Sequence, residues 1–388
     1  MRNDISGHQY VLIATNPKDS DSFLVQEALS RKNVQTELVH FTDFPSRSTA
    51  SLHLGQEVEQ DRWFLTHQNG RSQPPLPSAI WWRRPESPVL PSDVHPDDKK
   101  FVFQETAKFL RGLWHSLPSE IVYVNSPARA IEADRKPYQL QAAREVGLAI
   151  PPTLFSNDPA EIRATIRQWG GRAIYKSFGS VNNFWWDANK QRMRALFTTA
   201  VEEGSLPDDD ILSLTPGIYQ PRLDKVFELR ITVFGSTVFA TKIFSQEQGQ
   251  SQLDWRNGQG SLRYEPTEIP TSLRKLCFKM LRRLGLLMGC FDFVVTPQGE
   301  VVFLEVNEGG QFLWLETASG APLLDAFSDF LIHPHAGFRW TPSPEPLLIQ
   351  HIQAVATEKM AMAAENHIAP EPLIYIAAAP SASAEPDE

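Results

Sequence analysis

The stretch "CFDFVVTPQGEVVFLEVNEGG" constrains this chain most, because polar side chains interrupt two apolar strands that are joined by the turn "PQGE". Pairing Val295 with Val302 across this turn defines an antiparallel register. In that register Asp292 lies opposite Glu305. Asn307 shares their face because side chains alternate along a strand. The stretch therefore predicts that two carboxylates and one amide oxygen converge on one face of a sheet.

Two carboxylates that face each other in a sheet repel, so the pair Asp292 and Glu305 indicates a bound cation. Oxygen ligands without His or Cys favour Mg²⁺, with Mn²⁺ as a second possibility, over zinc. Mg²⁺ held by few protein ligands completes its shell with water and substrate phosphates, which indicates a nucleoside triphosphate. The alternative is that arginine side chains neutralise the two carboxylates.

Two lysines are candidates for binding phosphates. Lys136 lies at the start of a predicted helix, and Lys176 ends the apolar strand "RAIYK" ahead of a glycine-containing loop. The alternative for both is a lysine whose alkyl stem covers apolar surface while its ammonium group reaches water. That alternative is stronger for Lys136 than for Lys176, because a buried strand end has less access to water.

The stretch "ELRITVFGSTVFATKIF" predicts a second hairpin, with a two-residue turn at its "GS" pair. Glu228 and Arg230 share one face of its first strand, so they are either site residues or a structural ion pair. The turn sets Thr241 opposite Arg230, which places Lys242 on the other face. Lys242 therefore reaches the site only if a bulge shifts the register.

Element patterns divide the chain into segments. The opening "YVLIATNPKDSDSFLVQEAL" reads as a buried strand, a polar turn and a helix, which is typical of an α/β domain. From residue 211 onward strands dominate. The predicted segments are an N-terminal α/β domain at 1–125, a central subdomain at 126–210, a strand-rich subdomain with the metal site at 211–330, and a C-terminal helix with a disordered acidic tail at 331–388.

Charge and composition exclude several classes of protein. The formal net charge of −9 argues against a general nucleic-acid-binding protein. The longest apolar run, "LGLLMGCFDFVV", is too short to span a bilayer, so no membrane segment is predicted. Cys277 and Cys290 cannot build a disulfide framework, and the N-terminus has no secretory signal pattern, so a reducing cytoplasm is expected. P-loop, HExxH, GxSxG and GxGxxG motifs are all missing from the sequence.

Together these residues resemble the ATP-grasp ligases, and more narrowly the microviridin-type graspetide synthetases, which cyclise ribosomally made peptides. The resemblance covers roughly residues 8 to 330 and rests on "VNSPARAIEADRKPYQLQAAREVGLAIPPTLFSNDP", "YQPRLDKVFELRITVFG", "TKIFSQ", "DWR" and "FLEVNEGGQFLWLE". It implies an α/β (α+β) ATP-grasp fold with a Rossmann-like pre-ATP-grasp domain at the N-terminus. ATP would be held between two further units.

The resemblance implies a role for each candidate residue. Lysines would bind the phosphates of ATP, the hinge segment "YQPRLDK" would bind adenine, and the hairpin oxygens would hold Mg²⁺. Arg230 would stabilise the transferred phosphoryl group, and Arg256 and Lys242 would lie near the acceptor. The implied sets are Lys136, Lys176, Gln220, Pro221, Arg222, Asp224 and Glu228 for ATP, and Asp292, Glu305 and Asn307 for the metal.

Such an enzyme would phosphorylate an Asp or Glu side chain of a precursor peptide to an acyl phosphate. A Thr or Ser hydroxyl, or a Lys amine, of the same peptide would then attack it, giving a macrocyclic ester or amide with ADP and phosphate. A leader segment on the precursor and a homodimeric enzyme are further implications. The alternatives are a ligase that adds an amino acid to a protein or small molecule, and a non-catalytic, nucleotide-gated peptide-binding protein.

Two positions depart from the family pattern. The hinge reads "YQP", so Pro221 stands where an acidic residue is common, and Asp224 is the candidate replacement. This departure bears on the contact with adenine or ribose. The segment "EVNEGGQ" has Glu308 where proline is usual, which adds a negative charge beside the metal site.

Overall fold

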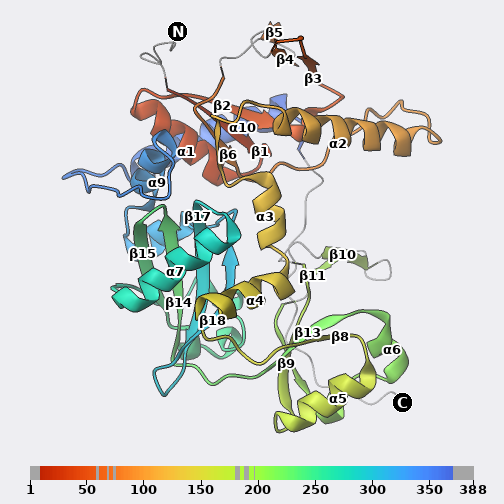
Figure 1. Ribbon diagram of the computed structural model, residues 1–388, viewed down its shortest axis with the longest axis vertical. Helices are drawn as coiled ribbons and strands as arrows, with labels where there is room; N and C mark the ends of the chain where they lie inside the picture. The colour runs from red at the N-terminus through yellow and green to blue at the C-terminus, as the bar shows by residue number, and fades with distance from the viewer. Residues whose placement is uncertain are drawn as a thin grey trace.

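The computed structural model describes residues 9–57, 61–67, 70–72, 76–179, 184–187, 192–195 and 197–369. An N-terminal α/β layer lies at the top of Figure 1, and two antiparallel sheets with their own helices lie below it. Within the described residues, no helix combines the length and the apolar character needed to cross a bilayer. The acidic tail predicted at the C-terminal end falls outside the described residues.

The N-terminal layer is built on a parallel sheet. Its elements are β1 (Tyr10–Thr15), α1 (Ser20–Arg31), β2 (Gln35–His40), β6 (Ala79–Trp82), α2 (Lys99–His115), β7 (Val122–Val124), α9 (Leu323–Ile332) and α10 (Ile349–Asn366). The strand order is β2–β1–β6–β7, and every residue of β1 is buried, as expected for a parallel strand covered on both faces. Val11 and Ile13 pack with α1, α9 and α10, whereas Leu12 and Ala14 pack with α2. A separate antiparallel sheet contains β3 (Thr49–His53), β4 (Arg62–His67) and β5 (Gly70–Ser72).

The central sheet is antiparallel, in the order β12–β9–β13–β8. Its elements are β8 (Leu154–Ser156), α5 (Pro159–Gln168), β9 (Arg172–Lys176), β12 (Thr199–Glu202), α6 (Asp209–Leu214) and β13 (Gly217–Pro221). Asp158 starts α5 by accepting a hydrogen bond from the backbone N–H of Ala160 at 2.9 Å. Ile162 and Ile166 of α5 then pack onto the sheet. A separate hairpin consists of β10 (Phe184–Asp187) and β11 (Arg192–Ala195).

The C-terminal sheet is also antiparallel, in the order β16–β15–β14–β17–β18. Its strands are β14 (Phe227–Phe234), β15 (Thr237–Ile243), β16 (Tyr264–Thr267), β17 (Met288–Val295) and β18 (Val301–Asn307). The nearby helices are α3 (Pro127–Ala133), α4 (Lys136–Val146), α7 (Thr271–Leu284) and α8 (Trp314–Ser319). Cys277 and Leu281 of α7 pack against Phe291 and Phe303 of the sheet. The 3₁₀ turns are Phe41–Asp43, Glu203–Ser205, Ser245–Glu247, Gly249–Ser251 and Trp255–Gly258.

The β14–β15 hairpin has the predicted two-residue turn and register. Arg230 lies opposite Thr241, and Lys242 lies opposite Leu229 on the other face. Gly235 begins the turn with φ +56°, and a Cβ there would lie 2.6 Å from the backbone oxygen of His335. Only glycine meets both requirements without displacing the backbone.

The β17–β18 hairpin has a register that differs from the prediction beside the turn. Val295 pairs with Val301, so the predicted register is wrong by one residue there. An irregularity between Asp292 and the following residue leaves Leu304 without a partner across the ladder. That extra residue restores the predicted pairing of Asp292 with Glu305.

Two helices pack differently from the predicted segments. The predicted central subdomain, 126–210, includes α3 and α4, but α4 contacts α7 and β18 of the C-terminal sheet. Likewise α9 crosses the boundary expected at residue 330. Both α9 and α10 contact α1. The C-terminal segment therefore returns to the N-terminal layer, where Lys359 Nζ lies 2.8 Å from Glu27 Oε2.

Candidate active site

One cavity of about 850 Å³ is lined by both antiparallel sheets and by the loop that follows β6. Its walls include β9 and β13 of the central sheet, and β14, β17 and β18 of the C-terminal sheet. All candidate residues except Lys242 line this cavity. They are Lys136, Lys176, Gln220, Pro221, Arg222, Asp224, Glu228, Arg230, Arg256, Asp292, Glu305 and Asn307.

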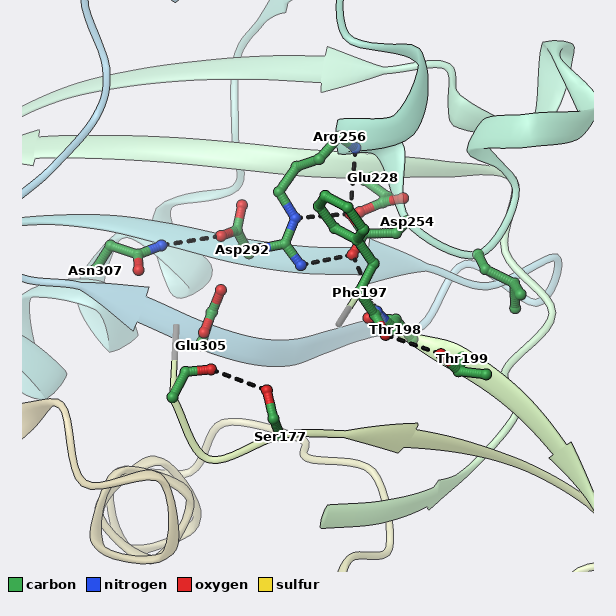
Figure 2. Close-up of polar contacts among 12 residues, drawn as sticks. Ser177, Phe197, Thr198, Thr199, Glu228, Asp254, Arg256, Asp292, Glu305 and Asn307 are labelled. Carbon is green, nitrogen blue, oxygen red and sulfur yellow. Dashed lines mark hydrogen bonds and ion pairs between the residues drawn. The ribbon is translucent and has the colours of Figure 1, made fainter. Parts of the chain in front are cut away.

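Three candidate metal ligands come from adjacent strands. Asp292 of β17 lies opposite Glu305 of β18. Asn307, the last residue of β18, donates from Nδ2 to Asp292 Oδ2 at 3.2 Å. Figure 2 shows the side chains of Asp292 and Glu305 pointing into the space that the Arg256 guanidinium also faces. The structure therefore brings two carboxylates and one amide together on one wall of the cavity.

Each of the two carboxylates has a cationic partner. Arg230 Nη1 on β14 lies 2.5 Å from Asp292 Oδ2, and Lys136 Nζ lies 2.9 Å from Glu305 Oε2. The Lys136 ammonium holds the pKa of Glu305 well below its usual range. Burial raises the pKa of Asp292, and the Arg230 guanidinium opposes that rise. Neutralisation by arginine, the alternative to a metal, thus applies to Asp292, while a lysine neutralises Glu305.

The two lysines occupy different environments. Burial lowers the pKa of Lys136, but Glu305 and Asp134 outweigh it and the pKa is raised above its usual value. Burial also lowers the pKa of Lys176, and there the opposing attraction of Glu305 does not outweigh burial. Within the part of the chain that the structure describes, Lys176 has no ion-pair partner. Because a desolvated ammonium without an anion is costly, Lys176 is suited to an anionic ligand.

The predicted hinge follows β13 along the cavity wall. Gln220 is buried and donates from Nε2 to Thr153 Oγ1 at 2.9 Å. Its Oε1 has no hydrogen-bond partner among the described residues. Pro221 has no backbone N–H, so this position can offer only its carbonyl to a ligand. Arg222 and Asp224 line the same wall.

Glu228 does not form the ion pair with Arg230 that the sequence left open. Its Oε1 lies 2.6 Å from Lys225 Nζ, and Lys225 also donates to the backbone oxygen of Leu253 at 3.3 Å. Burial raises the pKa of Glu228, while the Lys225 ammonium lowers it. Both side chains line the cavity on the side of the hinge.

Arg256 is held by a buried carboxylate two residues earlier. Asp254 Oδ1 accepts from Arg256 Nε at 2.7 Å, and Asp254 Oδ2 lies 2.6 Å from Arg256 Nη2. The backbone N–H of Thr198 donates to the same Oδ2 at 3.5 Å. Figure 2 shows this fork-like pairing, which fixes the plane of the guanidinium in the space that Asp292 and Glu305 also face.

Lys242 is the one candidate that the structure places elsewhere. Its Nζ lies 3.4 Å from Glu265 Oε1 and 5.4 Å from the centre of the Phe227 ring. The regular register of β14 and β15 has no bulge that would turn this side chain toward the cavity. The expectation that Lys242 lies near the acceptor is therefore not supported.

Several residues that line the cavity were missed by sequence reasoning. Trp255 and Trp314 stack with ring centres 5.0 Å apart, and both come from the motifs "DWR" and "GQFLW" that carried the resemblance. The two consecutive arginines that follow the strand "AIWW" could have indicated from the sequence that this strand end lies at the cavity. The missed lining residues include Arg83, Arg84, Lys225, Asp254, Trp255 and Trp314.

The residues present fit a magnesium nucleotide. Among the described residues, no group of three or more His, Cys, Asp or Glu side chains is arranged to hold a metal, so a cation here depends on Asn307 and on ligands from a substrate. Among the residues that the structure describes, Lys176 has no ion-pair partner, and the buried Arg230 Nε and Gln220 Oε1 have no hydrogen-bond partner. These atoms can pair with the phosphates and the base of a nucleotide.

This architecture and this cavity are those of the ATP-grasp fold preceded by a pre-ATP-grasp domain. Residues 10–130 match the family model described as the MvdD pre-ATP grasp domain. No curated protein sequence matches the chain. The N-terminal α/β layer is thus of the type predicted from the resemblance.

Solved structures of similar fold include two macrocyclases and a RiPP-associated ATP-grasp ligase. The chain is 27% identical to macrocyclase MdnB from Microcystis aeruginosa, with a TM-score of 0.69 over 84% of this chain and 100% of that chain. It is 26% identical to macrocyclase MdnC from the same organism, bound with precursor peptide MdnA, with a TM-score of 0.72 over 84% and 99%. It is 23% identical to a RiPP-associated ATP-grasp ligase of Chryseobacterium gregarium, with a TM-score of 0.76 over 86% and 100%. The resemblance to microviridin-type ATP-grasp ligases is confirmed.

Proposed function

We propose that this chain is an ATP- and Mg²⁺-dependent ligase that cyclises a ribosomally made precursor peptide through its own side chains. The cavity carries this proposal, because it sets Lys176, which has no ion-pair partner among the described residues, across from Asp292 and Glu305. Two solved structures of similar fold support the choice of substrate, since one holds a precursor peptide and the other holds ADP with a leader and core peptide.

The chemistry of each lining residue suggests which part of Mg-ATP it would bind. Asp292, Glu305 and Asn307 would hold Mg²⁺, and Lys136 and Lys176 would bind phosphate oxygens. The hinge residues would bind the base and ribose. They are Gln220, Pro221, Arg222, Asp224 and Glu228.

Two arginines face the place where negative charge develops during transfer. Arg230 lies beside Asp292, and Asp254 aims Arg256 at the same space. A guanidinium that is already oriented stabilises such charge without having to reorganise during the reaction. Bound Mg-ATP supplies a phosphoryl group that makes a carboxylate reactive toward a hydroxyl or an amine.

The reaction balances as two substitutions. A side-chain carboxylate oxygen of the peptide forms a bond to the γ-phosphorus while the bond to ADP breaks, giving an acyl phosphate. A Thr or Ser hydroxyl, or a Lys amine, then bonds to the acyl carbon and loses its proton, and phosphate leaves. The net product is a ring ester or amide with ADP and phosphate, and the peptide has lost one water per ring. Enclosure in the cavity keeps water from hydrolysing the acyl phosphate.

The test uses a peptide that is encoded beside this gene and is rich in Thr, Asp and Glu. The peptide is coexpressed with the chain, and its intact mass is measured. Loss of one or more waters with the wild type, and none with Glu305→Ala, supports ATP-driven cyclisation and counts the rings. A bound peptide of unchanged mass, with ADP released when a free amino acid is added, indicates the amino-acid ligase instead. A bound peptide with no ADP release indicates a nucleotide-gated binding protein.

Three further features belong to this proposal. The precursor would carry a leader segment that the enzyme recognises, the enzyme would be a homodimer, and it would act in the cytoplasm. The two free, buried cysteines are compatible with a reducing compartment. Size-exclusion chromatography with light scattering tests the homodimer directly.

A further inference from the structure

The loop that follows β18 is held almost entirely by side chains from other parts of the chain. Four consecutive carbonyls, at residues 308 to 311, come directly after Asn307. Arg83 Nη1 donates to the carbonyl oxygen of Gly309 at 2.6 Å and also to that of Gly310. Asn125 Nδ2 donates to the oxygen of Glu308 at 2.7 Å. The N-terminal layer and the segment next to it therefore hold three of the four carbonyls.

The fourth carbonyl belongs to the active-site cavity. Gln311 O accepts from Arg230 Nη2 at 3.0 Å and from Trp314 Nε1 at 3.1 Å. Gly310 has φ +50°, and a Cβ there would lie 2.9 Å from Met288 Cε, so the loop is also tightly packed from below. One end of this loop thus meets the candidate metal ligand Asn307, and the other meets Arg230.

The Arg83 side chain is itself held in place by ion pairs with the N-terminal layer. It is 2% exposed, with Nε at 3.2 Å from Asp19 Oδ2 and Nη2 at 2.9 Å from Asp21 Oδ2. Thr15 Oγ1 donates to Asp19 Oδ2 at 2.8 Å, which fixes that carboxylate in turn. Three nitrogens of one planar guanidinium therefore join two carboxylates of the N-terminal layer to two carbonyls of the loop.

We propose that Arg83 is a positioning residue for the candidate metal site: it sets the place of Asn307 and Gln311 by holding the two glycine carbonyls between them. The inference rests on the proposed function for the identity of the site. It gives the N-terminal layer a role in metal binding, although no residue of that layer belongs to the predicted ligand set. Partners that orient metal ligands from outside typically change metal affinity by about 10- to 100-fold when they are removed.

The decisive variant is Arg83→Lys. A lysine keeps the positive charge for Asp19 and Asp21, but a single ammonium cannot also reach both glycine carbonyls with the geometry of a planar fork. The control is Arg31→Lys on α1, where an exposed arginine pairs with Glu27 far from the loop. If Arg83→Lys does not fold, the neutral set Asp19→Asn, Asp21→Asn and Arg83→Met removes the loop contacts without leaving buried charges unpaired.

Two measurements decide the inference. The first is the affinity for Mn²⁺ in the presence of ADP, measured by electron paramagnetic resonance. The affinity for ADP in EDTA, without metal, is its reference. The second is hydrogen exchange of peptides covering residues 308–316 in the protein alone. We expect Mn²⁺ to bind about 10-fold more weakly and this segment to exchange faster, with metal-free ADP binding and exchange in β1 and β6 unchanged.

Two results overturn the inference. One is wild-type Mn²⁺ affinity and wild-type exchange in the variant, which means that the loop holds its place without Arg83. The other is loss of protection across the whole N-terminal sheet, which means that Arg83 only stabilises the fold. If the wild type binds no Mn²⁺ with ADP, the proposed function fails, and the hydrogen-exchange result still decides whether Arg83 positions the loop.

Discussion

Arg230 and Asp292 face each other on β14 and β17, with Nη1 of the arginine 2.5 Å from Oδ2 of the aspartate. The same Oδ2 accepts from Asn307, so both contacts use one oxygen. Oδ1 of Asp292 has no hydrogen-bond partner among the described residues. The arginine can therefore keep its contact while the other oxygen, with Glu305, binds a cation.

We expect Glu305→Gln to lower turnover by at least about 100-fold while the protein stays folded. The amide replaces a negatively charged oxygen ligand with a neutral, weaker one, and Lys136 keeps Asp134 at 3.4 Å as a partner. ADP release in the presence of peptide measures the turnover, and urea unfolding measures the stability.

The matched variant Asp292→Ala should also lose turnover, but at a cost of about 3 kcal/mol in the free energy of unfolding. The reason is that Arg230, only 4% exposed, is left without its anion. Full activity in both Glu305→Gln and Asp292→Ala would show that these two carboxylates do not hold the metal.

Local sequence patterns were enough to predict that these two carboxylates face each other, although the register from which this was predicted is partly wrong. Side-chain alternation placed Asp292 and Glu305 on one face, and the turn suggested a register that the structure contradicts at Val295. The bulge at Leu304 corrects the difference. A bulge in a run of apolar residues leaves no clear mark in a single sequence. The two-residue turn of the other hairpin was more informative, since it placed Lys242 on the face away from the cavity.

Contacts between distant segments were not predictable from the sequence. Arg83 and Gly309 are 226 positions apart, and nothing local to either residue indicates the other. The return of α10 to α1 is a similar case, because its contacts join the last described helix to the first. The partners of a charged side chain depend on tertiary packing, so sequence reasoning identified Lys136 and Lys176 but could not tell which of them is paired.

We expect Lys176→Met to weaken ADP binding by about 10-fold or more without lowering the thermal midpoint. Hydrogen bonds from a charged donor contribute about 1.5–3 kcal/mol, which corresponds to at least that factor. The stability should be unchanged or higher, because the folded protein no longer has to desolvate an ammonium group that forms no ion pair with any described residue. Calorimetric titration with ADP and a thermal melt measure the two effects.

The comparison variant is Lys136→Met, which removes the partner of Glu305 at 2.9 Å. It should lower both ADP affinity and stability. If Lys176→Met binds ADP as tightly as the wild type, Lys176 does not contact a phosphate.

Arg256→Lys should lower turnover of the peptide by about 100-fold and leave ADP affinity unchanged. A lysine cannot reproduce the two parallel contacts with Asp254, at 2.7 and 2.6 Å, that orient the guanidinium. Lys242→Ala is the matched control, since its side chain pairs with Glu265 and does not line the cavity. Turnover within twofold of the wild type is expected for that control. A large loss in Lys242→Ala would instead require the β15 strand to change register on substrate binding.

The pairing of Glu27 with Lys359 predicts a pH-dependent attachment of α10 to α1. Lys359 and Arg31, both at 2.8 Å, hold the pKa of Glu27 below its usual value. A carboxyl whose pKa is lower in the folded protein stabilises it above the unfolded pKa, about 4.3, and loses that contribution as the pH falls through the folded pKa.

Glu27→Gln should therefore lower the free energy of unfolding by about 1 kcal/mol at pH 7, and the difference should shrink below about pH 4. The magnitude is small because Lys359 and Arg31 are 37% and 57% exposed, so water screens both contacts. Urea unfolding of the variant and the wild type across this pH range is the measurement, with the exposed Glu358→Gln on α10 as control. An equal difference at pH 3.5 and pH 7 would mean that packing of the side chain, and not its charge, attaches the two helices.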